Sequence, residues 1–226
     1  MHRYIEARAH HADTRRIGAL LDDIIADPAL HARFVNTLAR MEYVGVRKLL
    51  KSRRADRLDL EGLQHMLDEN VHALRLKKAA TVLAASAGAR VTTFSDDDTL
   101  AGAAGEGYLQ ALDHDAEAGL ADLPPEKRPE ANYLLTTAAI EVRAQVFYPI
   151  YDARLSAHNV GFSVTAISKD EDRHLGEMAR GLERMFGDWR GRLERLLADE
   201  ERLFGDFLDK VELAVAVVRA ARVRLA

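Results

Sequence analysis

The sequence predicts an all-α protein organised as a four-helix bundle, with additional helices at its N- and C-terminal ends. Proline occurs only 5 times in 226 residues, and the long intervals between prolines place apolar residues three and four positions apart, the period of amphipathic helices. Two helix pairs separated by a long crossover follow along the chain, which is a four-helix bundle topology. We therefore expect one domain over residues 1–226, with the bundle core at about 28–187.

The first part of the chain predicts a short helix and then the first helix pair. The short helix covers about residues 16–26. Asp27 is the expected N-cap of a helix over about 28–52, which begins with a proline in its first turn. After a polar turn, Asp59 is expected to cap a second helix that ends near Ala85, where the sequence SAGARVTTFSDDD breaks the pattern. These two long helices should form an antiparallel hairpin.

The second part predicts the crossover, a second helix pair and a final helix. The crossover segment covers about residues 99–118, and the next helix covers about 130–155 with Pro149 as an expected kink. Ser163 is expected to cap the partner helix. The last helix, about 189–225, has a broad apolar face that suits packing against the bundle or a second subunit. We therefore expect a homodimer.

Composition excludes several classes of site. The chain has no cysteine, which rules out disulfides, thiolate nucleophiles, zinc ribbons and iron–sulfur clusters. The net charge is -4 with scattered basic residues, so charge gives no clear nucleic-acid or membrane signal. No apolar run approaches the about 18 residues of a membrane span, and the polar N-terminal residues do not resemble a signal peptide. The expected location is the cytoplasm.

Two Glu-x-x-His patterns stand out, and each lies on the second helix of a predicted pair. Glu69 and His72 occur in LDENVHAL, and Glu171 and His174 occur in KDEDRHLG. Residues three positions apart share one helix face, so the Glu and the His of one pattern can bind a metal ion together. The patterns therefore predict a metal site between the two hairpins.

Two further glutamates interrupt apolar stripes on the first helix of each pair. Glu42 and Glu141 lie among apolar residues at helical contact spacing, where a buried carboxylate needs a partner. Four carboxylates and two imidazoles can then meet at one level of the bundle. Such oxygen and nitrogen ligands suit two iron or manganese ions. The alternative is a bundle with a few buried salt bridges, which would leave negative charge in excess.

On these residues, over about 28–182, the chain resembles the ferritin-like di-iron carboxylate superfamily, including its rubrerythrin-like and oxygenase branches. In that superfamily a Glu from each of two helices and a Glu-x-x-His from each of the other two hold the metals. The resemblance implies six ligands: Glu42, Glu69, His72, Glu141, Glu171 and His174.

The stretch DEDRH also resembles the Asp-Glu-x-Arg-His element of bacterial di-iron monooxygenase hydroxylases and acyl carrier protein desaturases. The resemblance implies that Asp68 and Asp170 each accept a hydrogen bond from the ligand histidine of the opposite hairpin, and that Arg173 helps to orient the ligands of its own helix. The alternative is that both aspartates are surface acids. Asn70 stands where bacterioferritin-like proteins carry a haem-binding Met, so no haem is expected.

Three other residues are candidates for lining a cavity beside the metals. His65 lies one helical turn before Glu69, and Gln145 and Tyr148 follow Glu141 on the same helix. A lone additional histidine can equally be a satisfied or solvated residue, and a tyrosine in such a helix can simply belong to the core.

The resemblance implies chemistry with O2 or peroxide. The leading hypothesis is a non-haem di-iron oxidase or hydroxylase that acts on a small organic substrate and takes electrons from an external donor. The alternatives are a ferroxidase or peroxidase that handles iron or peroxide, and a subunit in which the metals are structural. An apolar cavity beside the metals would favour the first hypothesis, whereas an acidic entry path would favour the ferroxidase.

Overall fold

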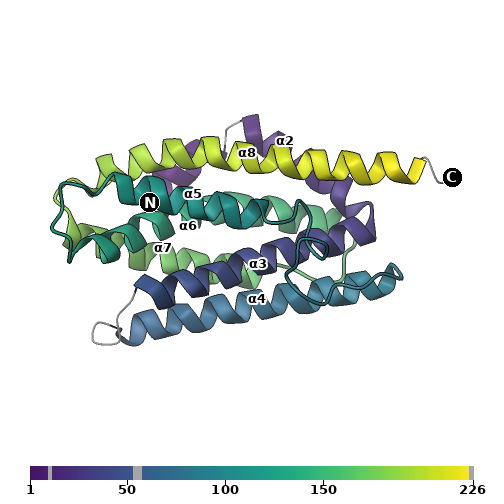
Figure 1. Cartoon of the computed structure of the whole chain (residues 1–226), viewed down its shortest axis with the longest axis horizontal. Helices are drawn as coiled ribbons and strands as arrows, with labels where there is room; N and C mark the ends of the chain where they lie inside the picture. The colour runs from purple at the N-terminus through teal and green to yellow at the C-terminus, as the bar shows by residue number, and fades with distance from the viewer. Residues whose placement is uncertain (10–11, 53–57, 224–226) are drawn as a thin grey trace.

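The computed structural model describes residues 1–9, 12–52 and 58–223, and every regular element in these ranges is a helix. The all-α prediction is confirmed. Figure 1 shows the helices running along the long axis of an elongated bundle. They are α1 (His2–Ala9), α2 (Ala12–Ile25), α3 (Pro28–Ser52), α4 (Leu60–Ser86), α5 (Ala104–Ala118), α6 (Arg128–Ala157), α7 (Thr165–Met185) and α8 (Trp189–Val223). None of these described helices is long and apolar enough to cross a membrane.

Consecutive helices make the two most extensive packing contacts. Helix α3 packs against α4, and α6 packs against α7. Helix α5 belongs to the connection between these pairs and lies against α8, while α2 packs on α6 (Figure 1). The site described below is formed where α3, α4, α6 and α7 face one another.

Both predicted N-caps in the first helix pair are confirmed. The side chain of Asp27 accepts hydrogen bonds from the backbone N–H groups of Ala29 and Leu30 at 3.1 and 3.3 Å. Asp59 accepts one from the N–H of Gly62 at 2.9 Å. Because these carboxylates satisfy N–H groups that have no partner within the helix, they fix where α3 and α4 begin.

The predicted crossover, about residues 99–118, begins with an irregular segment and continues as a helix. Ala101 and Gly102 have φ values of 62° and 55°, a left-handed conformation that cannot continue a right-handed helix. Helix α5 therefore begins at Ala104. Asn36 of α3 anchors the irregular segment by donating to the carbonyl oxygens of Thr93 and Asp98, both at 2.9 Å.

The predicted cap of α7 is wrong by one residue. Val164 occupies the N-cap position, and no side chain caps the helix there. Ser163 accepts a hydrogen bond from the N–H of Thr165 at 3.1 Å, while Asp152 accepts from the N–H of Val164 at 2.9 Å. A carboxylate from α6 thus takes part of the role expected of the serine. Helix α6 continues through Pro149.

The N- and C-terminal helices cover the bundle. Helix α1, which was not predicted, buries Tyr4. Val211 and Val215 of α8 are buried, whereas Leu213 and Val217 are 66 % and 59 % exposed. Residues 224 and 225 of the predicted final helix lie outside the described residues.

Candidate metal centre

Six acidic and histidine side chains from four helices converge inside the bundle. Helix α3 contributes Glu42, α4 contributes Glu69 and His72, α6 contributes Glu141, and α7 contributes Glu171 and His174. Both histidines are completely buried, and Glu69, Glu141 and Glu171 are at most 7 % exposed. All six residues named from the sequence patterns thus lie together.

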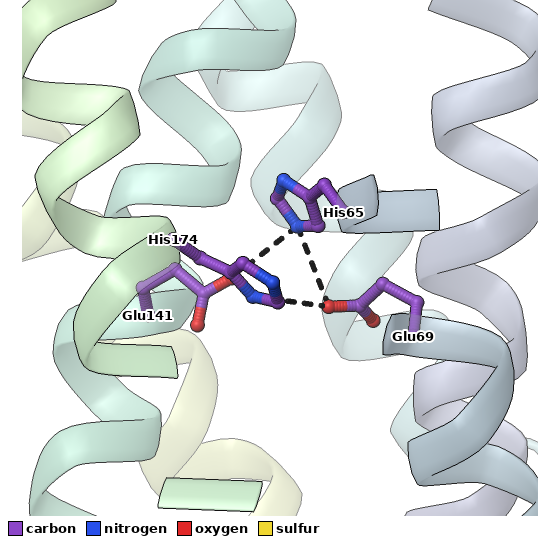
Figure 2. Close-up of side chains that lie close together, drawn as sticks. All are labelled: His65, Glu69, Glu141 and His174. Carbon is purple, nitrogen blue, oxygen red and sulfur yellow. Dashed lines mark ion pairs between the residues drawn. The ribbon is translucent and has the colours of Figure 1, made fainter. Parts of the chain in front are cut away.

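The potential ligand atoms form two adjacent groups, and the atoms of each group lie within 4.8 Å of one another. One group comes from His65, Glu69, Glu141 and His174, and the other comes from Glu42, Glu69, His72 and Glu171. Figure 2 shows the first group, with side chains from α4, α6 and α7 pointing toward one another. The Glu171 carboxylate faces both histidines of the Glu-x-x-His patterns. Its Oε1 lies 3.1 Å from Nδ1 of His72, and its Oε2 lies 2.9 Å from Nδ1 of His174.

Carboxylates of the opposite helix pair contact the outer nitrogens of these histidines. Nε2 of His72 lies 3.1 Å from Asp170, and Nε2 of His174 lies 3.4 Å from Asp68. A carboxylate partner at Nε2 holds a proton on that nitrogen, so Nδ1, which faces Glu171 at the centre, is the nitrogen available to a metal ion that displaces its proton. Arg173 donates to Asp68 and thereby holds the carboxylate next to His174.

The donor set fits a metal ion on two observations. Nδ1 of His72 is buried and makes no well-aligned hydrogen bond among the described residues, although Oε1 of Glu171 lies 3.1 Å away, and a metal ion between the two atoms would satisfy both. The second observation is the concentration of buried carboxylates around it. Oxygen and imidazole nitrogen donors without sulfur suit divalent iron, manganese or zinc.

Burial and mutual repulsion raise the pKa values of three of the four central carboxylates. Burial raises the pKa of Glu69 to about 7, and the negative charge of Glu171 adds to the effect. Burial and repulsion from neighbouring carboxylates also raise the pKa values of Glu42 and Glu141 well above the ordinary value. Burial would raise the pKa of Glu171 too, but its contacts with the two histidines outweigh burial and lower it. A bound cation would relieve this repulsion.

His65, which was predicted to line a cavity beside the metals, also lies among the potential ligand atoms of the centre. Its ring stacks on that of His174 with centroids 3.8 Å apart, and its Nε2 lies 3.4 Å from Oε1 of Glu69. Its Nδ1 lies 3.0 Å from the hydroxyl of Tyr133. Burial, together with His174, lowers the pKa of His65 to about 3, so the ring is a neutral potential ligand. The four-residue spacing between His65 and Glu69 was the sequence signal for this position.

Tyr148 and Gln145 were also predicted to line a cavity, and only Tyr148 does so. Tyr148 lines a cavity beside the centre and donates its hydroxyl proton to Glu42. The expectation for Gln145 is wrong, because its amide donates to the backbone oxygen of Ser168 on α7 at 2.7 Å, and its side chain is not part of the cavity wall. A helix presents residues four and seven positions after Glu141 at different angles, so only one of them reaches the cavity.

The cavity has a volume of about 110 Å³ and a mostly apolar wall. Glu42, Glu69, Glu141 and Glu171 border it. Its apolar wall includes Leu38, Met41, Leu109, Ile140, Phe147 and Phe204. An apolar cavity of about 150 Å³ in another protein holds benzene, so this space is close to the size of one small ring or a short carbon chain.

A second hollow, of about 240 Å³, has a mainly polar wall that includes His65 but none of the six ligand residues predicted from the sequence. Asp59, Glu61, Glu130 and Glu177 contribute acidic side chains to its wall, together with Lys127 and Arg184. His65 borders both this hollow and the apolar cavity. The imidazole therefore lies between a polar hollow and the apolar cavity.

Comparison with known proteins gives no relative for this chain: no protein-family model, curated protein or solved structure matches it.

Proposed function

We propose that this protein is a non-haem di-iron carboxylate enzyme of the ferritin-like type, and that it uses O2 to oxidise or hydroxylate a small organic substrate. In this proposal α3, α4, α6 and α7 form the ferritin-like four-helix bundle. The observation that supports an enzyme is the apolar cavity. Acidic and histidine residues of the centre form part of its wall, and the remaining space suits a carbon skeleton.

Each ion would have its own set of protein ligands. Glu42 and His72 would hold one ion, His174 and Glu141 would hold the other with His65 nearby, and Glu69 and Glu171 lie between the two sets. When bound, two ferrous ions supply the electrons for reduction of O2 in paired steps. Manganese is the alternative metal for the same donors.

The surrounding residues have roles that follow from their contacts. Asp170 and Asp68 orient the two histidines of the Glu-x-x-His patterns, since each carboxylate faces an outer ring nitrogen. Tyr148 holds Glu42 through its hydroxyl. The apolar wall excludes water from the space beside the ligands, which strengthens electrostatic interactions there and protects reactive species from side reactions.

A ferroxidase or peroxidase is the second candidate, and a separate observation favours it. The polar hollow that borders His65 carries four acidic side chains and two basic ones, and a wall with an excess of negative charge attracts ferrous ions. In an oxygenase the same hollow would serve only for loading the metal. The two functions differ in what accelerates oxidation of the iron: an organic substrate or a supply of further ferrous ions.

Anaerobic loading with ferrous iron followed by stopped-flow mixing with O2 tests the proposal. We expect about two iron ions per chain, because the ligand set is that of a dinuclear centre. Oxidation should be slow alone and faster with a suitable acyl, aromatic or quinone compound, with a product detected by mass spectrometry. Oxidation of many ferrous ions per chain without any response to organic compounds would replace the oxygenase with the ferroxidase, and failure to bind two ions would exclude both.

The proposed partners follow from this chemistry. An oxygenase needs an external electron donor in addition to O2 and substrate, and the cytoplasm supplies reducing partners. We also propose a homodimer, for which the exposed side chains of α8 offer an apolar surface.

A further inference from the structure

Helix α4 exposes a row of large apolar side chains on the face that points away from the metal centre. Five of them are 51–82 % exposed: Leu60, Leu63, Leu67, Leu74 and Val82. Together with the partly buried Val71 they form the α4 row. At 100° per residue the row occupies an arc of about 100°, and Glu69 and His72 lie on the other side of the helix. From residue 60 to residue 82 the row is about 33 Å long.

The α4 row lies at an edge of the bundle. Among the described helices, α4 packs mainly against α3 and also contacts α7, and Figure 1 shows it along the lower edge of the bundle. The exposed large apolar side chains of α8 are Leu213 and Val217, so the α4 row is the larger of the two surfaces. A continuous apolar surface of this length indicates an interface with another molecule.

The charges of α4 are divided between its two halves. Residues 59–70 contain four acidic residues and no Lys or Arg, and residues 71–86 contain three basic residues and no Asp or Glu. The helix dipole favours this order only within the first and last turns, and Asp68, Arg75 and Lys78 lie further inside. Two antiparallel copies of α4 would place the acidic half of each against the basic half of the other, whereas parallel copies would place like charges together.

The α4 row is also symmetric about Val71. Leu60 and Val82 lie eleven residues before and after it, and Leu67 and Leu74 lie four before and three after. In an antiparallel pair with a two-fold axis at Val71, Leu60 of one copy is therefore level with Val82 of the other, and Leu67 lies beside Leu74. An interface between two identical copies requires a surface that is complementary to itself in this way.

We propose that a second copy of this chain docks on the α4 row, so that the two α4 helices pack antiparallel about a two-fold axis at Val71. The apolar length, the division of charge and the symmetric spacing all suit this one partner. This assigns a surface to the homodimer proposed above and does not depend on the chemistry at the metals. Because α4 also carries Glu69 and His72, the interface lies directly behind two potential metal ligands.

Sedimentation velocity of the metal-loaded full chain over a range of concentrations tests the proposal. The wild type should be a dimer. Leu67→Gln/Leu74→Gln should weaken association by at least about 100-fold, because four leucines per dimer, each about half exposed in one copy alone, lose their apolar contacts. Glutamine has a helix propensity close to that of leucine, so the variant should stay folded, as circular dichroism verifies.

Leu213→Gln/Val217→Gln is the matched control, because it removes two similarly exposed apolar side chains from α8. This variant should remain a dimer. Arg75→Glu/Lys78→Glu should dissociate the dimer at low salt, since acidic residues of the two copies would then face one another. The dissociation should be weaker at high salt, which screens the repulsion.

The antiparallel orientation can be tested by cross-linking, because the chain contains no cysteine. A mixture of Leu60→Cys and Val82→Cys should give mixed dimers on treatment with a short thiol-specific cross-linker. Each variant alone should give none, since its two thiols lie at opposite ends of the paired helices. Parallel helices would give the reverse pattern.

Three outcomes would overturn the inference: a monomeric wild type, a dimer that the α8 variant dissociates and the α4 variants do not, or cross-linking within either cysteine variant alone. Monomeric protein that binds lipid vesicles through the α4 leucines would overturn it in favour of a membrane surface. A dimer that depends on the α4 row, in a protein that binds iron but oxidises no organic compound, would support the interface and contradict the proposed oxygenase.

Discussion

Replacing Gly45 with alanine tests the position of the Glu69 carboxylate with a single methyl group. Gly45 lies on α3 opposite Glu69, and a Cβ atom at this glycine would be 2.8 Å from Oε2 of that carboxylate. Ordinary contacts of such an atom begin at 3.4 Å, so the oxygen must move by about 0.6 Å or more. Metal–ligand distances tolerate only about 0.2 Å. The methyl group should therefore damage the centre without touching any other ligand.

Relative to the wild type, the Gly45→Ala variant should be slightly more stable without metal and less stable with metal. Alanine in a helix interior is about 0.5–1 kcal/mol more favourable than glycine, so the metal-free variant should be as stable as the wild type or slightly more stable. Displacing Glu69 should weaken metal binding by about 10- to 100-fold, as loss of ligand orientation does elsewhere. Free metal at 100 times Kd stabilises the wild type by about 2.7 kcal/mol, and a 100-fold weaker variant would keep only about 0.4 kcal/mol at the same concentration.

Thermal denaturation with and without divalent iron or manganese, combined with direct metal titration, measures both effects. Gly205→Ala is the matched control, because this glycine lies within α8 and a Cβ there would meet no atom within 4 Å. The control should gain the helix-propensity increment and retain the full metal-dependent stabilisation. If Gly45→Ala binds metal with unchanged affinity, Glu69 is not a ligand in the position described here.

Three further predictions concern single side chains. Glu141→Ala should lose at least one metal ion while keeping its helical content, measured by metal analysis and circular dichroism; unchanged metal binding would show that Glu141 is an ordinary buried acid. Asp170→Asn should lower metal affinity or activity by about 10- to 100-fold because the outer nitrogen of His72 loses its charged partner, and an affinity equal to that of the wild type would contradict this role. His31 is buried, and burial lowers its pKa to about 4 from 6.5; its neutral form therefore stabilises the fold above about pH 6.5, and this contribution is lost as the pH falls toward 4. Urea unfolding should show the wild type losing about 2–3 kcal/mol more than His31→Gln between pH 7.5 and pH 4.5, and equal losses would refute the assignment.

The sequence was sufficient for features that depend on neighbours along the chain. Asp27 followed by a proline predicted the start of α3, and Asp59 predicted the start of α4, since a capping side chain bonds N–H groups two or three residues away. Glu-x-x-His spacing put Glu69 and His72 on one face because the helical period is fixed. Ala101 shows the limit of this reasoning, because its left-handed conformation, shortly before α5 begins at Ala104, has no clear local signal.

Contacts between helices were decided by tertiary packing. Asp170 reaches His72 across the two helix pairs, and the sequence offered that contact only through a resemblance. His65 had a local signal in its spacing from Glu69, but its stacking on His174 depends on how closely α4 and α7 approach. Gln145 turned toward Ser168 and away from the cavity, a choice that depends on the angle at which α6 and α7 cross.

The pairing of Arg143 with Glu200 had no sequence signal at all. An arginine and a glutamate 57 positions apart are indistinguishable in the sequence from the many surface charges of a chain that is 30 % charged. Helical periodicity determines which face of a helix a residue occupies, and thus which residues can be buried. Which buried groups meet, and what space remains between them, depends on the distances and angles between helices, which many weak contacts along their whole length set together.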